Sequence, residues 1–317
     1  MSFWHKKNIL VTGGNGFLGK AVVRGLHLRG VEDKNIIIPN YPENDLRDYL
    51  TCLNFTKDID IVIHLAAKVG GILFNQKHPA SMIYDNIMMG FNLMEASRIN
   101  GVKKLVNLGT TCSYPENAPI PFLEDSLWDG YPALVTAPYG LAKKMLSELS
   151  KGYKTEYGFE SIFLLPVNLY GPEDNFIKEN AHVIPALIQR FENAFSEGTP
   201  SVKVWGTGKA TREFLYVDDA AEGILMATEY YNDTSPVNLG TGIETSIKDL
   251  VTIIADLIGY KGDIEWDLSK PDGTPRRCLD VSRAEKCFGF KANVSMLEGL
   301  QKTINWYRSA LLSNVSS

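Results

Sequence analysis

The stretch TGGNGFLG, residues 12–19, places four glycines in eight positions directly after a short apolar run. Gly14, Gly16 and Gly19 satisfy the spacing G-x-G-x-x-G, and Gly13, Gly16 and Gly19 satisfy G-x-x-G-x-x-G. Such glycines let the backbone turn tightly and approach a pyrophosphate, which the amino terminus of the following helix attracts. Because the motif follows a strand pattern and opens a helix pattern, it predicts a dinucleotide-binding loop. The alternative is that the glycines serve only a tight turn and close packing.

Short apolar runs and helical patterns alternate through the first 110 residues. Strands are predicted within residues 8–14, 34–40, 59–67 and 102–109, and helices within residues 16–30 and 80–101. Apolar strands separated by helices indicate a parallel sheet covered on both faces. Right-handed crossovers between such strands give a doubly wound, Rossmann-like α/β fold, whose ligands bind at the carboxyl ends of the strands.

Composition and charge argue against several classes of protein. The 317 residues carry a net charge of −5, whereas a nucleic-acid-binding protein usually shows a basic face. No run of 18 apolar residues is present, so we expect no membrane span. The amino terminus lacks the pattern of a signal peptide, which favours the cytoplasm. We expect reduced cysteines and no metal site there, because no metal-type spacing joins Cys52, Cys112, Cys278 and Cys287.

The end of the second predicted strand is the place where the cofactor is usually distinguished. An acid there binds the ribose hydroxyl of NAD, and a nearby arginine suits the phosphate of NADP. Pro39, Asn40 and Tyr41 fill this position, so the segment favours neither cofactor. Asp45 and Leu46 follow; they either border the adenine or are simply a turn residue and a core residue.

A second motif, Y-x-x-x-K, is formed by Tyr139 and Lys143 within a helical stretch. Residues four apart on a helix share one face, and a lysine cation beside a phenol is expected to lower the pKa of that phenol. Such a phenol can donate a proton to a carbonyl oxygen as hydride reaches the carbon. The hydroxyl of Thr110, about 30 residues earlier at a strand end, is placed to assist the same carbonyl.

These residues together resemble the extended short-chain dehydrogenase/reductase family. The resemblance spans nearly the whole chain and narrows to the branch of that family acting on GDP-4-keto-6-deoxy-D-mannose. The segments that carry it are AAKVGGI (66–72), GTTCSYP (109–115), PVNLYGPEDNF (166–176), NAHVIPALIQRF (180–191), VWGTGKATREFLYVDDAA (204–221) and KPDGTPRRCLDVSRA (270–284). The resemblance implies 3,5-epimerisation and 4-keto reduction of this sugar to GDP-L-fucose.

The same resemblance implies NADP(H) as the cofactor. The arginines that follow the second strand in the family are absent here, so NAD(H) stays open as an alternative. Thr110 stands where the family has serine and keeps the hydroxyl. The implied cofactor-binding residues are Gly13, Gly16, Gly19, Asn40, Asp45, Leu46, Lys143, Pro166 and His182.

The resemblance also assigns a proton-transfer pair, Cys112 and His182. A ketone at carbon 4 acidifies the protons on carbons 3 and 5, and inversion there needs a base and an acid on opposite faces. Thiol and imidazole groups, with reference pKa values of about 8.5 and 6.5, suit proton transfer in both directions. The alternatives are a small buried hydrophobic residue for Cys112, and a helix-start or core histidine for His182.

The residues implied to bind the substrate are Asn168, Arg190, Trp205, Arg212 and Asp272. Arginine suits phosphate oxygens by charge and forked geometry, and tryptophan can pack on an apolar face of a base or sugar. The alternatives are a solvated helix face for Arg190, a core position for Trp205 and an internal ion pair for Arg212.

For the whole chain we expect two domains and a homodimer. Residues 1–168 plus about 213–241 form the predicted dinucleotide-binding domain, and residues about 169–212 plus 242–317 form a smaller substrate domain. The dimer follows from the resemblance and from the Met-rich helix pattern near residues 82–94. Three alternatives stay open: another GDP-4-keto sugar such as a colitose or deoxyheptose precursor, an enzyme that only epimerises or only reduces, and a catalytically dead dinucleotide-sensing protein.

Overall fold

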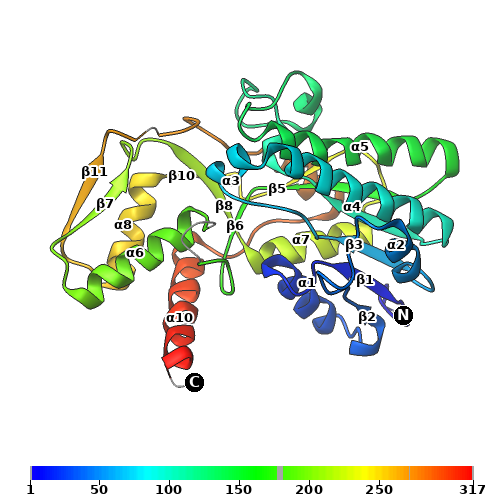
Figure 1. Cartoon of the computed structure of the whole chain (residues 1–317), viewed down its shortest axis with the longest axis horizontal. Helices are drawn as coiled ribbons and strands as arrows, with labels where there is room; N and C mark the ends of the chain where they lie inside the picture. Colours follow the sequence, from blue (N-terminus) through cyan, green and yellow to red (C-terminus); the bar gives the residue numbers. More distant parts are fainter. Residues whose placement is uncertain (1, 177–180, 271, 316–317) are drawn as a thin grey trace.

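The computed structural model describes residues 2–176, 181–270 and 272–315. Its centre is a six-stranded parallel sheet in the order β2-β1-β3-β4-β5-β9 (Figure 1). The strands are β1 (Ile9–Thr12), β2 (Ile36–Ile37), β3 (Ile61–His64), β4 (Lys104–Leu108), β5 (Ser161–Pro166) and β9 (Val237–Leu239). The predicted doubly wound α/β fold is confirmed.

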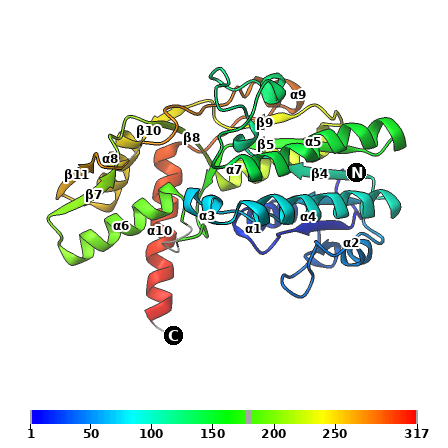
Figure 2. The same cartoon turned by 45° about the horizontal axis from the view of Figure 1, so that its top comes forward.

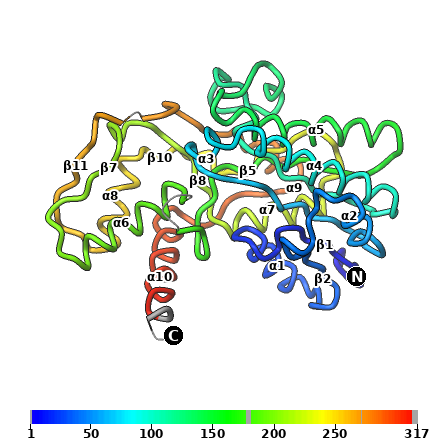
Figure 3. Tube along the Cα trace, in the orientation of Figure 1, coloured from blue at the N-terminus to red at the C-terminus, as the bar shows by residue number. Residues whose placement is uncertain are grey.

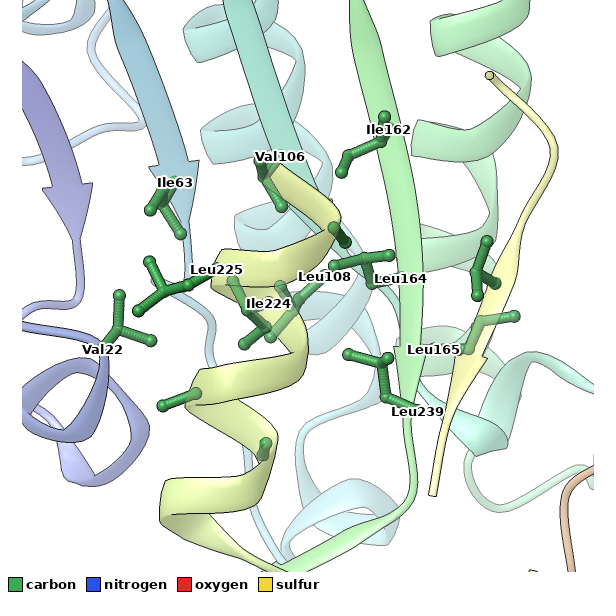
Figure 4. Close-up of a cluster of buried hydrophobic side chains, with 14 of the residues drawn as sticks. Val22, Ile63, Val106, Leu108, Ile162, Leu164, Leu165, Ile224, Leu225 and Leu239 are labelled. Carbon is green, nitrogen blue, oxygen red and sulfur yellow. The ribbon is translucent and has the colours of Figure 1, made fainter. Parts of the chain in front are cut away.

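Helices cover both faces of this sheet. One face carries α1 (Phe17–Leu28) and α7 (Val217–Tyr230), and the other carries α2 (Tyr49–Phe55), α4 (Pro79–Ile99) and α5 (Ala137–Tyr157). Successive strand residues point to opposite faces, so Ile61 and Ile63 join the core under α7 whereas Val62 joins the core under α4. Figure 4 shows the α7 side of this core, where Leu225 lies over the sheet near Ile63.

The second strand differs from its prediction. Residues 34–40 were expected to form a buried strand, but only Ile36 and Ile37 pair with β1, and both are half-buried. The reason is the position of β2 at the edge of the sheet, where only one neighbour is available. Pro39 follows two residues later and lacks the amide hydrogen that would continue a ladder.

A second, smaller core lies beside the sheet (Figures 1 and 2). It contains one three-stranded sheet, β10-β8-β6, and one two-stranded sheet, β11-β7. The strands are β6 (Asn168–Tyr170), β7 (Ser201–Trp205), β8 (Thr211–Tyr216), β10 (Glu244–Ser246) and β11 (Asp263–Asp267). Three helices pack on them: α6 (Val183–Glu197), α8 (Ile247–Ile258) and α10 (Met296–Val315).

After β11 the chain returns to the first core before it enters α10, as the trace in Figure 3 shows. The helix α9 (Ser282–Phe288) packs against α7 and β9, and Ala284 and Phe288 are buried in the sheet-bearing core. This segment falls in the range that the sequence assigned to the substrate domain. The remaining short elements are α3 (Ile72–Lys77) and the 3-10 turns η1 (Asp33–Asn35), η2 (Thr111–Ser113) and η3 (Glu124–Trp128).

None of the helices in residues 2–176, 181–270 and 272–315 is both long enough and apolar enough to cross a bilayer.

Candidate active site

The glycine loop joins β1 to α1 at the carboxyl edge of the sheet. Gly13 has φ +70, and a Cβ on it would lie 2.9 Å from the backbone nitrogen of Ala66. A Cβ on Gly19 would lie 2.0 Å from the carbonyl oxygen of Gly13, so no side chain fits there. Gly16 is the extended residue that precedes α1, and no side chain caps that helix. The loop therefore offers a narrow, backbone-lined cradle with free amide donors, which fits a dinucleotide pyrophosphate.

A buried hydrogen bond holds this loop against the next strand. Thr12 and His64 face each other in the β1–β3 pairing, and Thr12 Oγ1 lies 2.8 Å from His64 Nδ1. Burial, and secondarily the charge of Lys143, hold the pKa of His64 well below its usual range, so the ring is neutral. Sequence reasoning missed His64; its position at the end of the strand next to β1 is the signal that could have found it.

The segment after β2 contributes to the same edge. Asn15 of the glycine loop donates from Nδ2 to Oδ1 of Asn40 at 2.6 Å. Asp45 instead forms an ion pair with Arg47, at 2.5 Å. Leu46 is 5% exposed, and its side chain packs in the core under α4. Of the three predicted residues here, the structure brings Asn40 to the glycine loop.

Tyr139 and Lys143 lie one turn apart on α5. Lys143 is 2% exposed, and burial lowers its pKa to about 8. Burial also raises the pKa of Tyr139, helped by the neighbouring Cys112 and opposed by a hydrogen bond with Thr110. The net direction is therefore opposite to the expected lowering, because the removal of water from around the phenol is the largest contribution.

The turn η2 carries Thr110 and Cys112 against the start of α5. Thr110 caps the turn, and its Oγ1 accepts a hydrogen bond from the Cys112 amide at 3.2 Å. Ser113 Oγ donates to the carbonyl oxygen of Gly140 at 2.8 Å. Cys112 is half-buried rather than packed in the core, which argues against its alternative reading as a small hydrophobic residue. The thiol, the phenol and the Thr110 hydroxyl thus meet at one place.

One arginine, Arg277, approaches this place, and a second, Arg212, lies near Arg277. Nη1 of Arg277 lies 3.8 Å from Sγ of Cys112. Arg212 on β8 donates from Nη1 to the backbone oxygens of Thr211 and Thr274, each at 2.7 Å. Burial and then the nearby charge of Arg277 lower the pKa of Arg212. Arg277 belongs to the segment 270–284 that carries the family resemblance, but the sequence analysis assigned it no role.

The other residues predicted near the reacting carbons lie at element ends. Pro166 ends β5 and pairs with Leu239, while Asn168 begins β6 and is exposed. Asn168 donates from Nδ2 to the carbonyl oxygen of Glu213 at 3.1 Å. His182 is the residue preceding α6, as its sequence position indicated, and its pKa is lowered by removal from water. No hydrogen bond between described residues joins His182 to Cys112 or Tyr139.

A hollow of about 710 Å³ lies between α6 and β7. It is lined by Arg190, Lys203 and Trp205, among others. Trp205 is 60% exposed, so the reading of this tryptophan as a core residue is wrong. Arg190 is exposed and donates from Nη1 to the carbonyl oxygen of Lys203 at 2.5 Å. The structure thus brings two of the predicted substrate residues to one hollow.

Asp272 holds the turn that follows Trp205. Its two carboxylate oxygens accept from the amide and hydroxyl of Thr207 at 2.6 and 2.7 Å, and these bonds lower its pKa. Arg212 forms no ion pair among the described residues, so the ion-pair interpretation of that arginine is not supported. In residues 2–176, 181–270 and 272–315 no group of three His, Cys, Asp or Glu side chains could hold a metal ion.

Comparison with known proteins gives close matches over almost the whole chain. The chain is 39% identical to the GDP-L-fucose synthase of Escherichia coli (strain K12) over 95% of its length and 97% of that protein. A GDP-L-fucose synthetase from Naegleria fowleri bound to NADP superposes with a TM-score of 0.89 at 30% identity, over 99% of this chain and 96% of that one. A GDP-6-OMe-4-keto-L-xylo-heptose reductase from C. jejuni gives a TM-score of 0.89 at 28% identity, over 95% and 97%. Residues 9–240 match the NAD dependent epimerase/dehydratase family, and with these relatives they show that the chain belongs to it.

Proposed function

We propose that this protein is an enzyme that epimerises GDP-4-keto-6-deoxy-D-mannose at carbons 3 and 5 and reduces its C4 carbonyl, giving GDP-L-fucose. The observation that carries the proposal is the close packing of the η2 turn, which bears Cys112, on the first turn of α5, which bears Tyr139. A reductase alone has no need of a half-buried thiol beside its proton donor. The relatives named as GDP-L-fucose synthases support the same substrate.

The cofactor of this reaction is NADP(H). The backbone cradle of Gly13, Gly16 and Gly19 would hold its pyrophosphate, and Asn40 lies beside that cradle. When bound, the cofactor supplies the hydride for the C4 carbonyl. Lys143 is the buried cation of the site and contacts the cofactor in this proposal, with Pro166 and His182 contributing at the element ends.

The first chemical stage is proton exchange at carbons 3 and 5. Cys112 and His182 act as the base and acid of this stage, each on one face of the sugar. His182 is exposed, and only partial removal from water lowers its pKa, so the neutral ring is able to accept a proton near neutral pH. The C4 carbonyl takes up the electrons of the broken C–H bond as an enolate, and protonation on the other face inverts the carbon.

The second stage is protonation of the C4 oxygen as the carbon is reduced. Tyr139 donates this proton, because its raised pKa keeps the phenol protonated until the oxygen becomes basic. Thr110 is hydrogen-bonded to Tyr139, and its hydroxyl orients the C4 carbonyl of the sugar. Lys143, four residues along α5 and on the same face of the helix, supplies positive charge to the site when the phenol loses its proton.

The nucleotide part of the substrate binds at the surface of the smaller core. The exposed ring of Trp205 and the guanidinium of Arg190 line the 710 Å³ hollow, which suits a base and its attached phosphates. Arg212 on β8 serves the diphosphate, together with Asn168 on the neighbouring strand β6. Asp272 acts indirectly by holding the 206–207 turn next to Trp205.

Each core has its own task in this proposal. Residues 1–168 with about 213–241 bind the dinucleotide, and residues about 169–212 with 242–317 bind the nucleotide sugar. The packing of α9 on α7 and β9 supports moving residues 279–290 to the first group.

The enzyme is proposed to act as a cytoplasmic homodimer that pairs through α4 and α5. These helices pack on each other at one face of the sheet. Tyr84 on α4 is 60% exposed and Met145 on α5 is 40% exposed, which leaves apolar surface on both helices. No nucleic acid or membrane takes part in this function.

A second candidate substrate is a GDP-4-keto heptose or a colitose precursor. The similarity to a C. jejuni GDP-4-keto-heptose reductase favours keeping this possibility. The two sugars differ in substituents rather than in the reacting carbonyl, so the same thiol and phenol would serve either one.

The deciding experiment is incubation with GDP-4-keto-6-deoxy-D-mannose and NADPH, followed by NMR of the product. GDP-L-fucose is expected. Formation of an unepimerised GDP-6-deoxy sugar would show that the enzyme reduces without epimerising. Turnover of only the heptose would favour the second candidate. In heavy water without cofactor, the wild-type protein should incorporate deuterium at carbons 3 and 5, and Cys112→Ala should do so far more slowly; wild-type exchange in this variant would remove the thiol from the mechanism.

A further inference from the structure

Arg277 stands out because its charge has no acidic partner. Among the described residues it forms no ion pair, and its one side-chain hydrogen bond runs to Sγ of Cys112, 3.8 Å away. The preceding residue behaves differently, since Arg276 is exposed and paired with Glu244. Two adjacent arginines thus have separate roles, and the half-buried one is directed at the thiol.

The backbone on either side of Arg277 is held firmly, which fixes where its side chain can reach. The amide of Leu279 donates to the buried carboxylate of Glu213 at 2.7 Å. The carbonyl oxygen of Cys278 accepts from the amide of Phe122 at 2.8 Å, and the amide of Asp280 donates back to Phe122 at 3.0 Å. These hydrogen bonds hold residues 278–280 against the loop that follows η2. The backbone next to Arg277 is therefore fixed in position relative to Cys112.

The groups around the thiol make its ionised form the natural partner of Arg277. Tyr139 lies on α5 against the η2 turn that carries the thiol, and its raised pKa keeps it uncharged at neutral pH. Arg212 is a second cation near Arg277. A guanidinium within about 4 Å of a thiol favours the thiolate over the thiol.

We propose that Arg277 is the positioning residue that stabilises the thiolate of Cys112 and directs it at the substrate for epimerisation; this role rests on the function proposed above. The thiolate takes the proton from carbon 3 or 5, and the electrons of the C–H bond pass into the C4 carbonyl to give the enolate. A proton returned to the other face restores the carbonyl and leaves the carbon inverted. Arg277 gains and loses no proton in this cycle.

The competing role for Arg277 is direct binding of the substrate diphosphate. Arginine suits phosphate well, and Arg212 lies beside it. The observed contact to sulfur, and the fact that Arg277 is not among the residues that line the α6–β7 hollow, favour the thiolate role. The two roles predict different measurements, because only the first changes the thiol in the absence of substrate.

The test is the pH dependence of Cys112 alkylation by iodoacetamide in the full-length protein without substrate, followed by mass spectrometry of the labelled peptide. Cys287 is exposed and is replaced by serine in every variant, whereas Cys52 and Cys278 are buried. Arg277→Gln should slow alkylation at neutral pH about tenfold, because the thiolate is the nucleophile and loses its cationic partner. Arg277→Lys, which keeps the charge, should stay close to the parent.

Arg276→Gln is the matched control and should leave the profile unchanged, because Arg276 is engaged with Glu244. With substrate, Arg277→Gln should slow deuterium exchange at carbons 3 and 5 about tenfold at neutral pH, with KM nearly unchanged. An unchanged alkylation profile combined with a raised KM would overturn the proposal in favour of diphosphate binding. The alkylation result does not depend on the identity of the sugar. A failure of the role proposed for Arg277 can therefore be distinguished from a failure of the proposed function. If Arg277→Gln does not fold, Arg277→Met replaces it as the variant without charge, and Arg277→Lys remains the variant that keeps the charge.

Discussion

The carbonyl oxygen of Cys112 lies where the side chain of residue 140 would be: a Cβ built on Gly140 falls 2.2 Å from it. Gly140 directly follows Tyr139 in the first turn of α5. The absence of a side chain at this position lets the η2 turn approach the helix closely. Since the thiol is carried by η2 and the phenol by α5, this one contact sets the spacing of the two proposed proton-transfer groups.

Gly140→Ala should therefore reduce activity strongly without unfolding the protein. The added methyl group meets backbone rather than a flexible side chain, so η2 must move, and a displacement of about 1 Å at a reacting group costs about 10²-fold in rate. Gly152→Ala on the same helix is the control, because nothing lies within 4 Å of its Cβ position. That control should keep full turnover and gain up to about 1 kcal/mol of stability. Wild-type turnover in Gly140→Ala would show that the η2–α5 spacing is not critical.

Tyr139→Phe should abolish reduction while proton exchange at carbons 3 and 5 persists. The phenyl ring keeps the packing of the partly buried tyrosine, but the carbonyl oxygen loses its proton donor, which costs about 10²–10⁴ in rate. Cofactor oxidation and deuterium exchange measured on the same preparation separate the two stages. Reduction within a factor of about two of the parent enzyme would remove Tyr139 from the mechanism.

NADPH should be preferred over NADH, and Asn40→Asp should weaken that preference. Asn40 is hydrogen-bonded to the glycine loop and carries no charge. A carboxylate about 4 Å from a second anion costs about 1 kcal/mol in water, or roughly a fivefold change in kcat/KM. Steady-state rates with both cofactors measure the ratio, and Glu43→Asp, which keeps an exposed acid nearby, is the control. An unchanged ratio in Asn40→Asp would place the discriminating contact elsewhere.

Asp174 gives a prediction about stability and pH. It is 7% exposed, and burial raises its pKa from 3.8 to about 6. Its Oδ1 accepts from the Asn175 amide at 2.7 Å, while Oδ2 is buried without a hydrogen-bond partner among the described residues. A folded-state pKa above the unfolded one means that its stabilising contribution is complete below pH 3.8 and is lost as the pH rises through about 6.

Asp174→Asn should accordingly be more stable than the parent at pH 7, by up to about 3 kcal/mol, and the difference should shrink below pH 4. Urea unfolding at pH 4, 5, 6 and 7 gives the free energy of unfolding at each point. Asp256→Asn, which changes an exposed carboxylate on α8, should not alter the pH dependence. Parallel pH curves for Asp174→Asn and the parent would contradict the raised pKa.

Parts of the site that depend on short-range spacing were predictable from sequence. The glycine loop and the Tyr139–Lys143 pair need only a strand, a turn and a helix, whose patterns are local. The contact between Cys112 and Arg277 joins residues 165 positions apart, and no local pattern encodes it. Its position follows from hydrogen bonds of Glu213 and Phe122 that exist only in the folded chain.

Burial was the other quantity that sequence patterns could not supply. Charge logic predicted a lowered pKa for Tyr139, but the desolvation that reverses the direction depends on neighbours packed around α5. Trp205 fits a core position by its chemistry, yet it lies at the end of β7 with its ring exposed. The second strand was predicted to be longer than it is, because an apolar run does not reveal that its strand lies at the edge of the sheet.

The buried carboxylate of Glu213 links parts of the chain that would otherwise be independent. It sits on β8 and accepts hydrogen bonds from the amides of Thr241, Gly242 and Leu279, at 2.6, 2.8 and 2.7 Å. On β8 the side chains of Phe214 and Tyr216 belong to the smaller core, whereas the Leu279 side chain belongs to the larger one. The two cores are therefore joined by a buried hydrogen-bonded link that resists separation, since parting them would leave a buried carboxylate without donors. Any opening that admits the nucleotide sugar must carry β8 and these loops as one rigid body, with the flexing confined to elements outside that group.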